Sequence, residues 1–277
     1  MWVADITSRW FIFDTDGNLE EIWGSGGREP GQFNFRYDYG NGNVGEVASV
    51  TFAGDGSCYV ADAFNNRVQR FSSARNFIWS WGSRGSGDGQ FLLPASIAID
   101  SDGTVLVTDA ERGDIQRFTP EGVFISLFDA NGSANSNLVT PLVAVMDSAD
   151  RMYVVEAEAN RIRVFDRKGT QLFAFGLNTG SFSGLRIPTD IAIDAQGVVY
   201  VVDSEMNRIV LFASAGNFVH EFGGAGTDDG QFQRTGGVAL GGDGAVYVAD
   251  WEGNRIQKFQ LTDTLPIGRK MTATPAP

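Results

Sequence analysis

The 277-residue sequence contains one cysteine, one histidine and no long apolar run. The single cysteine, Cys58, excludes an internal disulfide, and its position at the apolar start of an expected strand predicts a buried, inert thiol. No segment approaches the ~18 apolar residues that a membrane-spanning helix needs. The first residues, MWVADITSR, lack the basic start and apolar stretch of a signal peptide. These absences predict a soluble chain without membrane insertion, and they leave its compartment and localisation unknown.

Positive charge is also scarce, because 21 Lys and Arg residues stand against 34 Asp and Glu, giving a net charge of −13. Such a charge favours solubility and repels phosphate backbones unless basic residues gather in one patch. The composition therefore argues against a nucleic-acid partner. An RNA-binding function would need a basic face, which the expected loops do not provide.

What the sequence does contain is repetition. The stretch YVADAFNNRVQRF at 59–71 returns as YVADWEGNRIQKF at 247–259, with related stretches at 106–118, 153–165 and 200–212 and a shorter one at 2–13. Each copy holds one acidic residue, and these repeated acids are spaced by 57 and then four times by 47 residues: Asp5, Asp62, Asp109, Glu156, Asp203 and Asp250. A constant period of this length indicates stacked or radially arranged units, none of which can bury its apolar face alone.

Within one period, residues 96–128 alternate apolar and polar over runs of four to six residues, separated by turn pairs such as Asp102-Gly103 and Glu121-Gly122. This pattern predicts four short antiparallel strands in each unit, which we letter a to d. Six four-stranded units of period 47 predict an all-β, six-bladed β-propeller, whose radial closure leaves only short edges. The phenylalanines that share one position of strand c should pack between blades: Phe71, Phe118, Phe165, Phe212 and Phe259.

The pattern Y-V-x-D-x-x-x-N-R-I/V-x-x-F, followed by G-Q-F before the next unit at 31–33, 89–91 and 230–232, resembles the NHL repeat. The resemblance extends to about residue 260 and implies a six-bladed propeller. It does not imply one activity, because NHL propellers serve as binding platforms in ubiquitin-ligase and RNA-regulatory proteins, as sensor domains of bacterial kinases and as an amidating lyase.

We expect a single domain over residues 1–260 and a Thr/Pro-rich tail or linker start over 261–277. The first unit begins directly with strand b, and the last unit ends after strand c. We therefore expect either an imperfectly closed ring or a monomeric domain within a longer chain, and whether outside residues supply these two strands stays open.

A recurring arginine accompanies the repeated acids, at Arg9, Arg67, Arg161, Arg208 and Arg255. A pair that occurs in nearly every unit suits a structural role, in which the carboxylate accepts turn N–H groups and the arginine braces a neighbouring strand. A ring of ligand-binding or catalytic pairs is the alternative. Unit 3 departs from the pattern, with Asp114 at the arginine position.

Residues that vary on the b–c loops are better candidates for function, since rigid scaffolds present specificity in loops. Two positions after the repeated acid stand Thr7, Phe64, Glu111, Glu158, Glu205 and Glu252. We expect these glutamates to form an acidic arc on one face, beside the exposed aromatics Phe64 and Trp251, and to suit a basic protein segment or a divalent cation. A merely solvated charged face is the alternative.

The longer first period reflects an insertion at residues 34–46 in the connection from strand d to the next strand a. It holds Arg36, Tyr37, Asp38 and Tyr39, and d–a connections leave the propeller on the same face as b–c loops. Because tyrosine offers contact area at little entropic cost, we expect a binding loop here; a neutral surface elaboration is the alternative.

The sequence offers few residues that could take part in catalysis. Propeller lyases use histidines, and the only histidine, His220, falls in an expected outer strand. A lactonase-like, metal-dependent hydrolase would hold a divalent cation such as Ca²⁺ through Asp, Asn and Glu at the axial channel, but no motif singles such residues out.

The sequence therefore predicts a non-catalytic interaction module without a cofactor, which recognises a protein or peptide through the face that carries the b–c loops and the 34–46 insertion. The metal-dependent hydrolase is the alternative. The partner's identity stays open.

Overall fold

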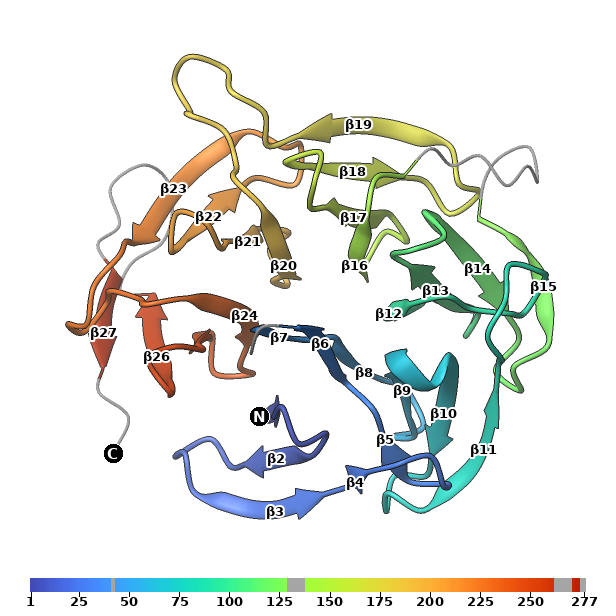
Figure 1. The fold of residues 1–277 in the computed structure, drawn as a ribbon. Helices are drawn as coiled ribbons and strands as arrows, with labels where there is room; N and C mark the ends of the chain where they lie inside the picture. The colour runs from blue at the N-terminus through green and yellow to red at the C-terminus, as the bar shows by residue number, and fades with distance from the viewer. Residues whose placement is uncertain (41–42, 129–137, 262–270, 275–277) are drawn as a thin grey trace.

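The computed structural model describes residues 1–40, 43–128, 138–261 and 271–274, whose six larger β-sheets surround a central axis (Figure 1). Each sheet is one blade of antiparallel strands that runs from the axis outward. The fold is the six-bladed β-propeller predicted from the repeats. No α-helix occurs in the described ranges, and the only helical turn is a 3-10 turn at Ala63–Asn65. Accordingly, these ranges contain no helix able to span a membrane.

The strands follow in chain order. Blade 1 has β1 (Trp2–Ala4), β2 (Trp10–Phe13) and β3 (Leu19–Trp23); blade 2 has β8 (Ala48–Phe52), β9 (Cys58–Asp62), β10 (Arg67–Phe71) and β11 (Phe77–Trp81). Blade 3 has β12 (Pro94–Ile99), β13 (Val105–Asp109), β14 (Asp114–Phe118) and β15 (Phe124–Leu127); blade 4 has β16 (Pro141–Met146), β17 (Met152–Glu156), β18 (Arg161–Phe165) and β19 (Gln171–Phe175). Blade 5 has β20 (Pro188–Ile193), β21 (Val199–Asp203), β22 (Arg208–Phe212) and β23 (Phe218–Gly223); blade 6 has β24 (Thr235–Leu240), β25 (Ala245–Asp250), β26 (Arg255–Leu261) and β27 (Met271–Thr274).

Glycine is required where strand d turns into the next blade. Gly82 has φ +102°, and a Cβ there would lie 2.6 Å from the Phe91 ring and 2.9 Å from the Asn66 carbonyl oxygen. Gly223 repeats this geometry against Phe232. The glycine and the GQF phenylalanine therefore form one packing unit, in which the ring lies against bare backbone.

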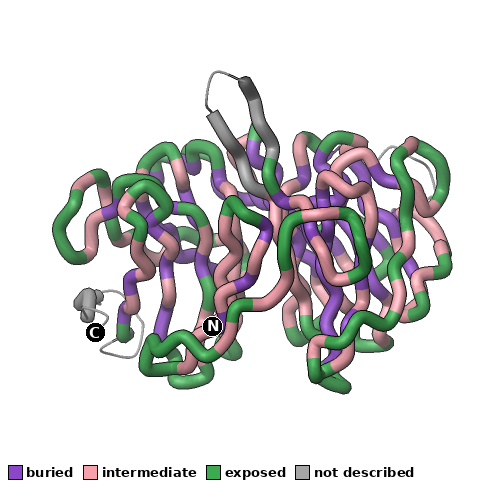
Figure 2. The backbone as a smooth tube through the Cα atoms, turned by 60° about the horizontal axis from the view of Figure 1, so that its bottom comes forward, coloured by how far each residue is buried: buried purple, intermediate pink, exposed green. Residues whose placement is uncertain are grey.

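The hydrophobic core is divided among the interfaces between neighbouring blades. One cluster joins Tyr153 and Val164 of blade 4 to Val201 and Phe212 of blade 5. As predicted, the five phenylalanines of strand c are at most 4% exposed. Figure 2 shows buried residues along the strands and exposed residues at the turns. Cys58 is also buried as predicted, and burial raises the pKa of its thiol to about 11.

Blade 1 has three strands, as the sequence predicted, and its β1 lies at the inner edge of the sheet. Blade 6 differs from the prediction because β27 pairs antiparallel with β26, so that this sheet has four strands. The prediction that the last unit ends after strand c was therefore wrong. The sequence MTAT was assigned to the Thr/Pro-rich tail, but its backbone satisfies the outer edge of β26. The domain boundary at residue 260 stays a prediction.

The 34–46 insertion contains a β-hairpin. Its strands are β6 (Arg36–Gly40) and β7 (Asn43–Glu46), and the Val47 N–H closes its base by donating to the Phe35 carbonyl at 2.9 Å. Phe35 is fully buried and lies edge-on to Trp10. A second short ladder, between β4 (Ser25–Gly26) and β5 (Gln32–Phe33), is parallel and lies within the preceding connection.

Candidate functional site

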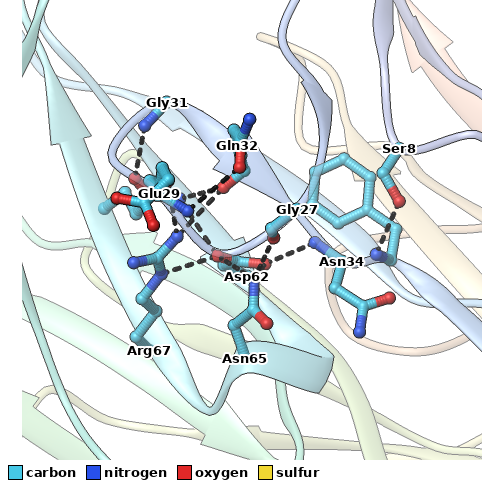
Figure 3. Close-up of polar contacts among 11 residues, drawn as sticks. Ser8, Gly27, Glu29, Gly31, Gln32, Asn34, Asp62, Asn65 and Arg67 are labelled. Atoms are coloured by element: carbon cyan, nitrogen blue, oxygen red, sulfur yellow. Dashed lines mark hydrogen bonds and ion pairs between the residues drawn. The ribbon is translucent and has the colours of Figure 1, made fainter.

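The face that carries the b–c loops is held together by the repeated acids. In blade 2, the Asp62 carboxylate accepts hydrogen bonds from the Asn34 N–H at 2.7 Å, from Asn65 Nδ2 and from Arg67 Nε at 2.7 Å (Figure 3). The Arg67 guanidinium also donates to the carbonyls of Glu29 and Gln32. One buried carboxylate thus fixes the b–c loop against the d–a connection that precedes its blade. We call the face formed by the b–c loops and these d–a connections the b–c face.

The same arrangement recurs around the ring. Asp203 accepts the Arg186 N–H at 2.7 Å and Arg208 Nε at 2.8 Å. Asp250 accepts the Gln233 and Arg234 N–H groups and Arg255 Nε at 3.0 Å. The side chains of Asp62, Asp203 and Asp250 are fully buried. These contacts tie each blade to the connection that enters it.

Blades 3 and 4 reach the same result with different residues. In blade 3, Arg112 donates to the carbonyls of Gly87 and Gln90, as Arg67 does in blade 2, and forms a 2.7 Å ion pair with Asp114. The guanidinium therefore comes from two positions earlier in the chain. In blade 4, Glu156 accepts the Val139 N–H at 2.8 Å and pairs with Arg161 at 2.5 Å.

A recurring glutamine was missed by the sequence reasoning, although its signal was present in the repeated I/V-Q of strand c. Gln69, Gln116 and Gln257 donate through Nε2 to the carbonyls of Gln32, Gln90 and Gln231, respectively. All three are nearly or fully buried. They belong to the scaffold that positions the loops.

Blade 1 is the exception. The Asp5 carboxylate contacts the Thr7 and Arg9 groups of its own loop, including a 2.7 Å ion pair with Arg9, and its side chain is 23% exposed. Desolvation at Asp5 is outweighed by the hydrogen bonds from Arg9 and Thr7, so its pKa is lowered. At Asp62 and Asp203, desolvation prevails over the same kinds of bonds and raises the pKa.

Most of the variable residues of the b–c face are exposed, but Phe64, which was predicted to be an exposed aromatic, is not. Glu111, Glu158, Glu205 and Glu252 all have exposed side chains, Trp251 is 36% exposed, and Phe64 is half-buried. Arg234 stacks on the Trp251 ring at 4.7 Å and lies 3.5 Å from Glu252. The face also carries the exposed Arg186, which sequence reasoning missed because it lies in a d–a connection rather than a b–c loop. The charge of this face is therefore mixed.

The insertion rises from the same face, because Asn34 at its start binds Asp62 and its carbonyl accepts the Phe64 N–H at 3.0 Å. Arg36 is exposed at the base of β6. Tyr37, Asp38 and Tyr39 belong to β6, but their side chains lie outside the described part of the structure.

Near the axis, Asp190 on β20 carries a carboxylate without an ion pair among the described residues. Its Oδ2 accepts the Val238 N–H of the next blade at 2.8 Å. Burial raises its pKa to about 6 despite that bond and one from the Ile191 N–H. Ser96 occupies the equivalent position of β12 and accepts the Ala144 N–H at 3.4 Å, so this position links neighbouring a strands.

His220 lies on β23, the outermost strand of blade 5, as the sequence predicted. It borders an outer hollow of about 580 Å³ beside the β19–β20 connection, where Phe182 stacks on Phe218 and Arg208 pairs with Glu221 at 2.7 Å. In residues 1–40, 43–128, 138–261 and 271–274, no three His, Cys, Asp or Glu side chains are placed to share a metal ion.

The sequence model described as NHL repeat matches this chain at residues 91–118, 185–212 and 232–259. These segments end with strand c of blades 3, 5 and 6; those of blades 3 and 6 begin at the GQF phenylalanine of a d–a connection, and that of blade 5 begins at Leu185. No curated protein sequence matches the chain.

Several solved structures share the fold at low sequence identity. Virginiamycin B lyase from Staphylococcus aureus aligns with a TM-score of 0.63 and 16% identity, over 99% of this chain and 83% of that one. The same lyase, with a histidine-to-alanine change that makes it catalytically inactive and with quinupristin, aligns with a TM-score of 0.63 and 15% identity over the same shares. The structure of a nidogen/laminin complex aligns with a TM-score of 0.67 and 16% identity, over 94% of this chain and 88% of that one. An enzyme and a protein found in a complex thus share this architecture.

Proposed function

Because this chain is a six-bladed β-propeller containing NHL repeats, we propose that it is a non-catalytic module that binds a protein or peptide through the b–c face. The observation that carries the proposal is the contrast on that face between fixed backbone and exposed side chains. In blades 2 to 6, buried acids hold the b–c loop against the preceding connection, while Trp251 and four glutamates project from the face. A rigid surface with an aromatic residue amid polar ones has the composition of a protein-binding patch.

The insertion adds to this surface. A two-stranded hairpin anchored by the buried Phe35 extends the face without disturbing the blades. The nidogen/laminin complex supports a binding role by analogy of fold alone. The lyase is the enzymatic precedent, and its inactive variant lacks a histidine. The single histidine here lies on an outermost strand, away from the axis, and this favours binding over that chemistry.

Affinity purification from the source cells tests the proposal with matched variants. Glu158→Lys/Glu205→Lys, Trp251→Ala and a variant with residues 37–45 replaced by two glycines alter the b–c face. Glu121→Lys is the control, because Glu121 is exposed on a c–d turn at the opposite face. We expect a partner whose recovery falls at least about tenfold, or ~1.4 kcal/mol, with one or more face variants and is unchanged with the control. The proposal would be contradicted if partner recovery fell as much with Glu121→Lys as with the face variants, or if every face variant retained the partners.

A further inference from the structure

The connection from β19 to β20 departs from the repeat. In the connections that enter blades 2, 3 and 6, the GQF glutamine folds its Oε1 back onto a backbone N–H of the same turn, as Gln90 does with Gly87 at 3.0 Å. The connection that enters blade 5 has SGL at 183–185 instead, so its turn lacks that side chain. This connection extends outward at the rim between blades 4 and 5 (Figure 1).

An aromatic pair lies beside this connection. Phe182 is 4% exposed, although it stands where the connections into blades 3 and 6 have the exposed Asp88 and Asp229. Its ring stacks on Phe218 of β23 with centroids 5.0 Å apart and packs edge-on against Phe212. Phe218 itself is 39% exposed. The pair therefore presents a flat apolar surface at the outer rim.

Polar groups surround this surface in the outer hollow of about 580 Å³, a volume within the range of small-molecule sites. The connection supplies Asn178, Ser181 and Ser183, and β23 supplies His220 and Glu221. All of these side chains are exposed or half-buried. The hollow thus combines one aromatic surface with hydroxyl, amide, imidazole and carboxylate groups.

Contacts within the connection fix the walls of the hollow. The Asn178 side-chain oxygen accepts the Gly180 N–H at 2.8 Å, and the Leu185 N–H donates to the Gly176 carbonyl at 2.7 Å. Gly184 lets the two ends of the connection approach, because a Cβ there would lie 3.0 Å from the Asn178 nitrogen. The hollow is therefore formed before a ligand enters, which reduces the ordering cost of binding.

The charges at the hollow are balanced. Arg208 donates to Glu221 at 2.7 Å and to the Gly184 carbonyl at 2.8 Å. The Arg208 side chain is only 10% exposed, whereas that of Glu221 is 44% exposed and lines the hollow. An anionic ligand would therefore meet a carboxylate, and a cationic one would compete with Arg208 for it. This arrangement favours an uncharged ligand.

We propose that this hollow binds an uncharged pyranose sugar unit. A pyranose ring has an apolar C–H face, which fits the exposed ring of Phe218, and hydroxyl groups that both donate and accept hydrogen bonds. The serine hydroxyls and the Asn178 amide also donate and accept. A carboxylate has about four acceptor positions, so Glu221 can accept from a sugar hydroxyl while it pairs with Arg208. Sugar hydroxyls that are matched in this way lose little by leaving water.

The sugar site goes beyond the proposed function. Its side chains come from β23 and the β19–β20 connection, and none belongs to a b–c loop or to the 34–46 insertion. The variants that test partner binding therefore leave the hollow unchanged, and the two proposals stand or fall separately.

Phe77 of blade 2 is a matched control for Phe218. Each begins strand d opposite a phenylalanine of strand c, and their exposed fractions are 37% and 39%. Blade 2 has Trp79 and Ser80 at the positions of the histidine and the glutamate. Phe77→Ala therefore removes the same side chain from the same place in a blade that lacks these two polar groups.

The probes are the methyl glycosides of glucose, galactose, mannose and N-acetylglucosamine, titrated into the 277-residue chain and followed by saturation-transfer NMR. We expect at least one to bind saturably with a Kd of about 10 mM or lower. Phe218→Ala should weaken its binding about fivefold or more, because the stacking surface is lost. Glu221→Gln should weaken it about threefold or more, because a charge-assisted hydrogen bond is lost. Phe77→Ala should change the Kd less than about twofold.

Ser181→Lys separates loss of the site from loss of the fold. Ser181 is exposed, so a longer side chain there occupies the hollow without disturbing the buried rings. We expect it to weaken binding about fivefold or more while the Tm changes by less than about 4 °C.

Three outcomes would overturn the proposal. One is the absence of saturable binding by every glycoside at about 50 mM. Another is an equal loss of affinity with Phe77→Ala and Phe218→Ala, or unchanged affinity with Ser181→Lys. The third is binding of glucuronic acid or glucosamine at least as tight as that of the uncharged glycosides.

Discussion

Blades 1 and 5 carry the same acid–arginine pair, yet the two carboxylates differ in their surroundings. Asp203 in blade 5 is fully buried and binds both its own arginine and the backbone of the preceding connection. Asp5 in blade 1 binds only groups of its own loop and stays partly exposed. The difference shows that the incoming connection, and not the local motif, buries the acid. The motif is therefore a device for joining blades.

Removing the two carboxylates sharpens this comparison and should give the largest effect. Asp203→Ala leaves the Arg208 guanidinium and the Arg186 N–H without their buried acceptor, which should cost about 3–5 kcal/mol. Asp5→Ala removes a solvent-accessible pair and should cost less than about 1 kcal/mol. Urea unfolding followed by tryptophan fluorescence measures both. Similar losses for the two variants would contradict the role assigned to the incoming connection.

Two variants of blade 3 test whether stability depends on the guanidinium itself or on the sequence position that supplies it. Arg112 and Asp114 are 7% and 6% exposed, so Arg112→Met leaves a buried carboxylate without its cation and should cost about 3 kcal/mol. Arg112→Met/Asp114→Arg restores the arrangement of blade 5, where Met206 precedes Asn207 and Arg208. Denaturant unfolding should show the double variant to be more stable than the single one. A double variant no better than Arg112→Met would mean that the two positions are not equivalent.

The sequence specified the blades better than it specified their contacts. A constant period and alternating residues determine strands and blade number, because each unit must bury its apolar faces against the next. In blade 3 the guanidinium comes from Arg112, two positions earlier in the repeat than Arg208 in blade 5. This difference could not be predicted, since it depends on which side chain reaches the carbonyls of Gly87 and Gln90. Arg186 was missed for a similar reason, because its place beside the b–c loops depends on the hydrogen bond from its N–H to Asp203.

The inner strands offer a second comparison, in which β20 carries Asp190 where β16 carries Val143. Burial raises the pKa of Asp190 to about 6 from an ordinary value of 3.8. Between these values the folded protein binds more protons than the unfolded chain, so the free energy of unfolding falls as pH rises. Between pH 4.5 and 7.5, the wild type should lose about 2 kcal/mol relative to Asp190→Asn. Parallel stability curves for the two proteins would show that the carboxylate does not titrate in this range.

The smallest effect is expected at Trp251, where blade 6 departs from blades 2 to 4. Those blades place the buried alanines Ala63, Ala110 and Ala157 after the repeated acid, whereas Trp251 is 36% exposed and touches Arg234. Trp251→Ala therefore gives blade 6 the residue that the other blades tolerate. It should cost less than about 1 kcal/mol, since only an exposed cation–π contact and partial burial are lost.

Thermal unfolding measures this change as a shift in Tm of less than about 4 °C. Ala157→Ser is a suitable control, because it alters the same loop position in blade 4, where the residue is buried. A small shift together with lost partner binding would place Trp251 in a recognition surface. A large shift would instead make the ring part of the fold, and the exposed side of blade 6 would then no longer support the proposed binding function. The same substitution thus separates the two explanations for a large aromatic residue at a position that the repeat otherwise keeps small.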